Sequence, residues 1–315
     1  MLDSIFIKKN ALLLTTLVIT LVALLLPSLY LPDIRTRSLY HLWETGHVLV
    51  FFLICHFSCQ LFPQFSHCNS IKKLSLFFFI AICFAFTIEW IQSFISGKSL
   101  EFSDIVGDTT GVLLFLSFRA RCAGRTPSVL HGLAILLLGL VFWPVFSSFT
   151  DERLAEHQFP LLTDFETPFE ASRFEGKTAY ASISGEQAFQ GQHSLRLSFF
   201  PGPWSGMMLK HFPSNWQRYS HLHFAVYNPT SQPVSFHVRI HDALHEQGKK
   251  PYSDLYSQIF SLSAGDWTRI MIPLAQVYAA PLERRMDLAD IRGLGFFVVK
   301  EEKPLVLYLD TVGLE

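Results

Sequence analysis

One stretch of otherwise apolar sequence holds side chains that could transfer protons or pair with cations. It reads IEWIQSFISGKSLEFSDIVGDTTG, residues 88–111, and it contains four acids and one lysine. Charge inside a membrane segment costs roughly 2.5–3.5 kcal/mol, so such groups pair with one another or face a cavity. We therefore predict a shared polar site. Its candidate catalytic residues are Glu44, His47, Glu89, Gln92, Lys98, Asp104 and Asp108.

A carboxylate held away from water becomes a better proton acceptor. Glu89 or Asp108 would act as the base and His47 as its proton partner. The alternative interpretation is structural: Asp104 caps a helix, Glu44 is a solvated loop residue, and the polar cluster only locks helices together.

The composition divides the chain into two halves. Of the 315 residues, 50% are hydrophobic and 31 are Phe. Residues 1–149 carry 10 Lys and Arg with 7 Asp and Glu, whereas residues 150–315 carry 15 and 19. This pattern predicts a membrane domain at 1–149 and a soluble domain at 150–315. The net charge of −1 gives no electrostatic reason to expect nucleic acid as a partner, and all five cysteines precede the soluble half.

Five apolar stretches predict a bundle of five transmembrane helices. They are residues 11–31, 47–62, 74–94, 105–118 and 129–146. Lys and Arg precede the first, third and fifth stretches in excess, which places those loops inside. This charge bias predicts a multi-pass membrane protein with the N-terminus cytoplasmic and residues 150–315 extracytoplasmic. That the membrane is the bacterial inner membrane is implied by a family resemblance of the same helices.

The predicted topology brings the ionisable residues to one depth near the outer surface. Glu44 and His47 begin the second span, Glu89 lies in the outer part of the third, and Asp108 lies near the outer start of the fourth. Gly107 and Gly111, four residues apart, would let the fourth span approach a neighbour closely.

The same residues carry a resemblance to a known family. Glu89-x-x-Gln92, then Lys98, Phe102-Ser103-Asp104, Asp108 and Gly111, resembles the signature of VanZ-like membrane proteins, and Glu44-Thr-Gly-His47 resembles their acid-and-His entry to an earlier helix. The resemblance covers roughly residues 10–120.

Two positions depart from that signature. Lys98 stands where Arg is more usual and Asp108 where Asn is. Lys makes poorer bidentate contacts than Arg, so a substrate or metal preference would differ. The resemblance implies a bacterial envelope protein from a family named for its link to antibiotic resistance, through reduced susceptibility to glycopeptides.

After residue 149 the sequence changes to short alternating pieces. VSFHVRIHD predicts a strand with Phe236, Val238 and Ile240 toward the core, and with His237 and Arg239 outward. About eight such pieces predict an all-β jelly-roll sandwich. LLTDFETPFEASRFEG, Gly191-x-x-Ser194-Leu195 and LYLDTVGL are similar to galactose-binding-like, carbohydrate-binding jelly rolls.

This second resemblance implies two sites. Sugar binding uses aromatic rings beside polar groups. The candidate glycan-binding residues are Trp204, Trp216, Tyr227, Arg239, His241, Asp242, Tyr252 and Tyr256. Such domains often hold a structural calcium ion, for which Glu166 and Asp310 are the candidate ligands. Each site has a plainer alternative: the aromatic residues belong to the core, and Asp310 belongs to a turn. The histidines of this half are read as solvated side chains and not as a zinc site.

Two hypotheses follow for the function. In the first, the outward-facing polar site acts on or organises a lipid-linked or surface glycan that the jelly roll binds, with membrane lipids as the other partner. In the second, the protein is a non-enzymatic, membrane-anchored glycan-binding or assembly factor whose polar cluster is structural. A transporter is the weaker third reading, because five spans show no inverted repeat. The soluble half holds no nucleophile elbow and no nucleotide-binding signature.

Overall fold

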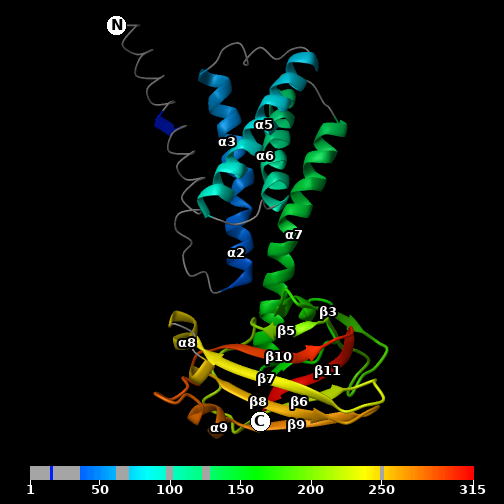
Figure 1. Cartoon of the computed structure of the whole chain (residues 1–315). Coiled ribbons are helices and arrows are strands. Elements are labelled where there is room, and N and C mark those ends of the chain that lie inside the picture. The colour runs from blue at the N-terminus through cyan, green and yellow to red at the C-terminus, as the bar shows by residue number, and fades with distance from the viewer. Residues whose placement is uncertain (1–14, 17–35, 62–70, 97–101, 123–127, 249–251) are drawn as a thin grey trace. The chain divides into compact units, whose positions relative to one another are not determined.

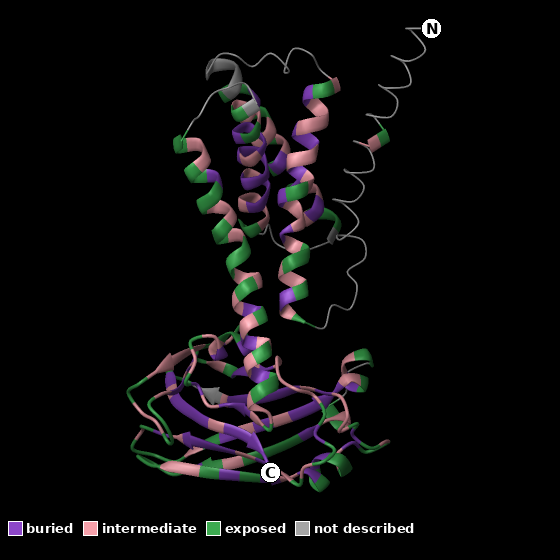
Figure 2. Cartoon of the chain, turned by 180° about the vertical axis from the view of Figure 1, so that it is seen from behind, coloured by how far each residue is buried: buried purple, intermediate pink, exposed green. Residues whose placement is uncertain are grey.

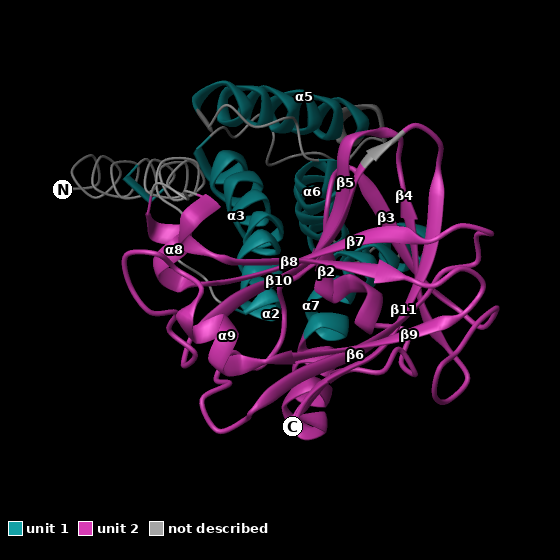
Figure 3. Cartoon of the chain, turned by 60° about the horizontal axis from the view of Figure 1, so that its bottom comes forward, with its two compact units in different colours: residues 1–148 teal, residues 149–315 magenta. Residues whose placement is uncertain are grey.

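The chain divides into two compact units, residues 1–148 and 149–315 (Figure 3). The computed structural model describes residues 15–16, 36–61, 71–96, 102–122, 128–248 and 252–315. The first predicted span, residues 11–31, and the candidate residue Lys98 lie outside the described residues.

The first unit is helical (Figure 1). Its described helices are α2 (Arg37–Glu44), α3 (Gly46–Leu61), α5 (Ile71–Ser96), α6 (Phe102–Cys122) and α7 (Ser128–Gln158). Among the described residues, three stretches are long and apolar enough to cross a membrane, namely Arg37–Leu61, Ser75–Ile95 and Ser128–Gln158.

The described helices therefore give three candidate spans where the sequence predicts five. The fourth predicted span does form a helix, α6, but α6 is not among the three. Its two aspartates and its last-turn Arg119 and Arg121 lower its apolar character. Residues buried between neighbouring helices need not be as apolar as residues that face lipid, so a helix of this kind depends on its neighbours.

Helix α6 packs against both α3 and α5. Phe51, Phe77 and Phe115 lie in the apolar core between these helices. Gly111 lies where α6 comes nearest to α3: a Cβ atom there would meet the carbonyl oxygen of Val48 and lie 3.0 Å from Cβ of Phe51. The close approach expected from the Gly107 and Gly111 spacing is thus confirmed at Gly111. Helix α7 is mostly exposed, with little buried surface along its apolar part (Figure 2).

The second unit is a sandwich of two antiparallel sheets. Sheet A has the strand order β3-β4-β11-β6-β9, with β1 also paired to β11; sheet B has the order β2-β5-β10-β7-β8. The strands of sheet A are β1 (Leu161–Thr163), β3 (Ala179–Ser184), β4 (Ser194–Phe199), β6 (His221–Tyr227), β9 (Trp267–Pro273) and β11 (Leu305–Leu314). Those of sheet B are β2 (Phe174–Glu175), β5 (Gly202–Leu209), β7 (Val234–Asp242), β8 (Tyr256–Leu262) and β10 (Ile291–Glu301).

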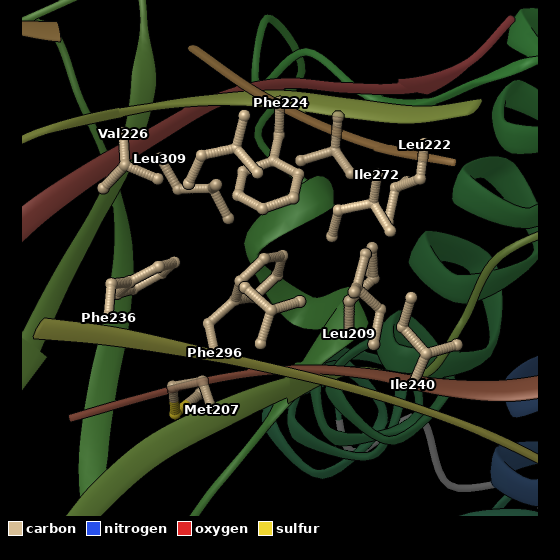
Figure 4. Packing of buried hydrophobic residues seen from close by; sticks show 14 of the residues in the cluster. Met207, Leu209, Leu222, Phe224, Val226, Phe236, Ile240, Ile272, Phe296 and Leu309 are labelled. Carbon is tan, nitrogen blue, oxygen red and sulfur yellow. The ribbon is translucent and has the colours of Figure 1, made fainter. Parts of the chain in front are cut away.

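The core of the sandwich lies between the two sheets, as predicted. Phe224 and Leu309 from sheet A point toward Phe296 and Ile240 from sheet B (Figure 4). Phe236, which the alternation of β7 predicts to be internal, is fully buried. Burying one such side chain contributes about 1.5–3 kcal/mol, so this apolar layer is the main stabilising contact of the unit.

The last turns of α7 belong to the second unit and are fixed by a buried ion pair. Arg173, at the end of a short 3-10 helix η1 (Glu170–Arg173), donates from Nε and Nη2 to Asp151 of α7 at 3.0 and 2.7 Å. Its Nη1 donates to the carbonyl oxygen of Leu162. Both charged side chains are almost fully buried. Helix α7 therefore continues twelve residues beyond the end predicted at position 146.

Candidate functional site

In the helical unit the first candidate contact joins α3 to α6. His47 Nδ1 and Asp108 Oδ1 lie 2.9 Å apart, a hydrogen bond in which the imidazole donates to the carboxylate. The side chain of His47 is 12% exposed and that of Asp108 is 1% exposed. Gly107 lies beside this histidine, since a Cβ atom at position 107 would lie 3.4 Å from Cβ of His47.

A third helix adds another carboxylate to this pair. Glu89 on α5 is buried, and its charge acts on both His47 and Asp108. Gln92, one turn further along α5, is also buried. Asp104 acts on His47 from the first turn of α6. Of the seven candidate residues, the structure thus brings His47, Glu89, Asp104 and Asp108 into one electrostatic group.

One oxygen of this group is unused. Oδ2 of Asp108 is buried and has no hydrogen-bond partner among the described residues. A buried acceptor without a donor costs about 1–3 kcal/mol, and such atoms are rare in native structures. An imidazole, two carboxylates and a free acceptor are the components of a proton-transfer site.

Glu44, at the end of α2, makes a different contact. Its carboxylate lies 3.0 Å from Nδ1 of His41, three residues earlier. Glu44, which the sequence predicts in the polar site, is therefore paired within helix α2. Among the described residues, no contact joins it to the His47–Asp108 pair.

In the sandwich, one face of sheet B collects aromatic and cationic side chains. The cross-strand register places Arg239 of β7 opposite Gly295 of β10 and Ser257 of β8. Phe297 of β10 lies opposite Gly206 of β5 and His237 of β7. We call this surface the sheet-B face. Its members are Trp204, His237, Arg239, Tyr252, Ile259 and Phe297.

The guanidinium of Arg239 lies against two rings of this face. Its Cζ is 4.8 Å from the ring centroid of Tyr252 and 4.8 Å from that of Phe297. Phe297 in turn covers glycine backbone, because a Cβ atom at Gly206 or Gly295 would meet its ring. Glycines at both positions therefore let an aromatic ring lie along the outer surface of the sheet.

The rim of the sheet-B face is open to solvent. The indole of Trp204 is 54% exposed and contacts Phe297 edge-on at 6.4 Å, while Tyr252 is 59% exposed. Burial and the charge of Arg239 lower the pKa of His237, so this imidazole is neutral at neutral pH and can both donate and accept hydrogen bonds. Flat rings beside planar donors and a neutral imidazole can contact the apolar side of a sugar and its hydroxyl groups.

Five of the eight predicted glycan-binding residues lie elsewhere. Trp216 and Tyr256 belong to the core, which corrects their expected exposure. Trp216 follows no strand alternation, so its inward direction could not be derived from the sequence. Tyr227 is on the outer surface of sheet A, where its ring lies 5.5 Å from that of Trp267.

The remaining two are engaged at the end of β7. Asp242 caps helix α8 (Ala243–Gln247) by accepting from the backbone N–H of His245, and it binds Arg284. His241 is buried and contacts Glu246 at 3.2 Å. Three predicted residues, Trp204, Arg239 and Tyr252, therefore share the sheet-B face. His237, Ile259 and Phe297 of this face are not among the predicted glycan-binding residues. The alternation in LGFFVV does indicate that only one of its two phenylalanines can face inward.

The two predicted calcium ligands hold one loop from two sides. Asp310 Oδ2 accepts from the backbone N–H groups of Phe189 and Gln190 at 2.7 and 3.1 Å. Glu166 Oε1 accepts from those of Gln192 and His193 at 2.7 and 2.9 Å. These bonds engage one oxygen of each carboxylate with loop backbone. Among the described residues, no group of three or more His, Cys, Asp or Glu side chains is arranged to hold one.

No protein family and no curated protein matches the chain in sequence. Solved structures that it resembles include an exo-β-agarase, at 14% identity and a TM-score of 0.40, over 49% of this chain and 24% of that one. A family 11 carbohydrate-binding module from Clostridium thermocellum matches at 15% identity and a TM-score of 0.35, over 49% of this chain and 93% of that one. A xylan-binding domain of family 22 matches at 12% identity and a TM-score of 0.33, over 49% of this chain and 91% of that one.

The fold thus defines a class: a helical unit with apolar helices, followed by an antiparallel β-sandwich. The chain spans about a quarter of the length of the two agarases that it matches. With identities of 12–15% and TM-scores below 0.5, these similarities do not by themselves identify a ligand for this chain.

Proposed function

We propose that this protein is a membrane-anchored glycan-binding protein of the bacterial envelope and that the sheet-B face holds the glycan. One observation carries the proposal: Arg239 lies between the rings of Tyr252 and Phe297, beside the exposed indole of Trp204. Exposed aromatic side chains that form a contiguous patch rimmed by polar groups are typical of a ligand-binding surface. Sugars fit such a surface, since they offer an apolar ring face edged by hydroxyl groups.

The proposal is tested by glycan-array binding of the full-length chain in an uncharged detergent. Trp204→Ala removes the exposed ring, and we expect a loss of binding of roughly 5- to 150-fold, by analogy with the 1–3 kcal/mol that stacking on an aromatic side chain contributes for nucleic-acid bases. Tyr180→Ala is the matched control, because Tyr180 is an equally exposed ring (61%) on strand β3 of sheet A. Absence of any glycan binding, or equal losses in both variants, would contradict the proposal.

We further propose that the helical unit is a VanZ-like membrane domain whose polar site acts on a lipid-linked or surface glycan. The buried, unpartnered Oδ2 of Asp108 supports this second function, since it leaves an acceptor for a substrate hydroxyl or a proton. Asp108 or Glu89 would act as the base that takes the proton from the substrate, and His47 would be its proton partner. The sandwich would raise the effective concentration of the polymer near the membrane.

The alternative is that the cluster only locks the helices together. Glu89→Gln and Asp108→Asn separate the two readings, since each keeps the shape of the side chain and removes its charge. Normal abundance with altered glycopeptide susceptibility would support the catalytic reading. Normal abundance with an unchanged phenotype would rule out the catalytic reading, and a collapse in abundance would show that the cluster is structural.

A structural calcium ion at Glu166 and Asp310 stays a prediction. Calcium takes 6–8 oxygen ligands, so an occupied site would recruit further oxygens around these carboxylates. The melting temperature of the full-length chain in EDTA and in millimolar calcium tests it. A calcium-dependent rise that Asp310→Asn abolishes would support the ion, and an unchanged melting temperature would leave both carboxylates as loop anchors.

A further inference from the structure

Arg239 lacks the close acidic partner that several other arginines of the sandwich have. Arg173, Arg284 and Arg292 each bind a carboxylate at 3.0 Å or less. For Arg239 no ion pair is found among the described residues, and its Nε is buried without a hydrogen-bond partner. A guanidinium is always charged in proteins, so this residue is a half-buried cation that lacks a counterion.

The surroundings of Arg239 hold this cation in place without neutralising it. The rings of Tyr252 and Phe297 attract it through their π faces, and the phenol of Tyr252 is itself anchored to Ser257 Oγ at 2.9 Å. Cation–π contacts of this kind hold the guanidinium over the rings without cancelling its charge. The donors of the planar fork are therefore fixed in direction before a ligand arrives, which lowers the entropic cost of binding.

The remaining polar group next to Arg239 on this face is uncharged. His237, two residues earlier on β7, points to the same side and has a lowered pKa, because of burial and of the charge of Arg239. A ligand that lies across Trp204, His237 and Arg239 thus meets an aromatic ring, a neutral hydrogen-bonding ring and one fixed positive charge. This combination is complementary to a sugar that carries a negative charge.

We propose that the glycan bound by the sheet-B face is acidic and that Arg239 binds its carboxylate or sulfate groups through paired N–H donors. The inference rests on the proposed glycan-binding function and narrows it to one substrate class. Paired N–H···O bonds of arginine to an oxyanion are about twice as strong as neutral hydrogen bonds. A neutral polymer would leave the charge of Arg239 uncompensated beneath it.

Pairs of polymers that differ in charge on a similar backbone test this inference. Polygalacturonate is compared with its highly methyl-esterified form, and sulfated carrageenan with agarose, by calorimetry with the full-length chain in uncharged detergent at low and at 0.3 M salt. We expect the charged member of at least one pair to bind roughly 10- to 100-fold more tightly, as hydrogen bonds to charged groups allow. The pair that shows the difference identifies the oxyanion as carboxylate or sulfate.

Variants of the arginine assign the effect to this residue. Arg239→Gln is expected to reduce affinity for the charged polymer to that for its neutral partner, and Arg239→Lys to restore only part of it, because lysine lacks the planar fork. Arg269→Gln is the control, since Arg269 lies over the ring of Phe189 at 5.8 Å on the other sheet. Melting temperatures of all variants exclude misfolding.

Each outcome is decisive. Equal binding of neutral and charged polymers, unaffected by Arg239→Gln, overturns the acidic class and keeps the glycan-binding proposal. A loss of affinity in Arg269→Gln equal to that in Arg239→Gln overturns the assignment to the sheet-B face. Binding of none of the four polymers contradicts both proposals.

Discussion

His47 and Asp108, sixty-one positions apart in the chain, share a 2.9 Å hydrogen bond between helices α3 and α6. The bond fixes the histidine tautomer, because the carboxylate can only accept from an N–H at Nδ1. It also leaves the other carboxylate oxygen without a partner among the described residues. The pair therefore joins the two helices through Oδ1 of Asp108 and leaves Oδ2 as an acceptor that the helix contact does not use.

Removing the imidazole should destabilise the helical unit. His47→Ala leaves both oxygens of Asp108 buried without a donor, so we expect a loss on the order of 1–3 kcal/mol and a lower melting temperature in detergent. His56→Ala, on the same helix, is the control, because the hydrogen bond of His56 to Gln60 is exposed. Equal effects of the two substitutions would contradict the assigned contact.

Gly111 should tolerate no side chain. Gly111→Ala places a methyl group against the carbonyl oxygen of Val48, which forces α6 away from α3, and overpacking of this kind costs about 1–3 kcal/mol. The measurement is the yield and thermal stability of the detergent-solubilised chain. Gly132→Ala on α7 is matched in chemistry but meets nothing within 4 Å, and it should be neutral. A stable Gly111→Ala protein would show that these helices are further apart.

Glu170 should make the sandwich less stable as the pH rises. Burial, first, and the charges of Asp164 and Asp151 raise the pKa of this carboxyl from 4.5 to about 7, although Arg173 opposes the shift. Arg173 can balance only one acid, and Asp151 takes its donors. Between pH 4.5 and pH 7 the unfolded chain releases the proton that the folded chain keeps, so stability falls across this window and is level above it.

Thermal unfolding as a function of pH measures this effect. The full loss is on the order of 3 kcal/mol from the size of the shift. Glu170→Gln should flatten the decrease between pH 4.5 and pH 7, whereas Glu302→Gln, at an exposed position, should keep it. A wild-type melting temperature that rises steadily across this window would contradict the prediction.

The loop held by Glu166 and Asp310 should depend on one glycine. Gly191 has φ 73°, and a Cβ atom there would meet the carboxylate of Glu166. Gly191→Ala is therefore strained both in its backbone and in its contacts, and we expect a loss of about 1–3 kcal/mol in the free energy of unfolding. Gly185→Ala, in the same loop with its nearest atom at 3.6 Å, should have little effect, and amide hydrogen exchange of residues 189–193 is the readout.

The proposed topology has a direct test. The positive-inside bias places the N-terminus in the cytoplasm and residues 150–315 outside. A periplasm-active reporter fused after Glu315 should be active. The same reporter fused within residues 62–70, in the loop that the charge bias places inside, should be inactive. Activity of a cytoplasm-only reporter at the C-terminus would reverse the orientation and remove a surface glycan as a partner.

Much of the fold can be predicted because its causes are local. The change near residue 150 from long apolar runs to alternating ones is a property of the sequence itself. Two-residue periodicity assigns Phe236, Val238 and Ile240 to one side of their strand, and all three are buried. The grouping of His47 with Asp108 could be predicted as well, because helical spacing and the predicted topology place both residues at a common depth.

Other features depend on which strands become neighbours. Trp204 and Trp216 look alike as candidates in the sequence, but only Trp204 is on a strand whose partner, β10, brings a phenylalanine to its outer side. The sequence around Arg239 does not reveal that it lacks a counterion, because the residues that could pair with it are distant in the chain. The sequence by itself determined the two halves, the strand faces and the acids in the apolar helices. Tertiary structure alone decided the sheet-B face, since cross-strand register sets which distant side chains meet.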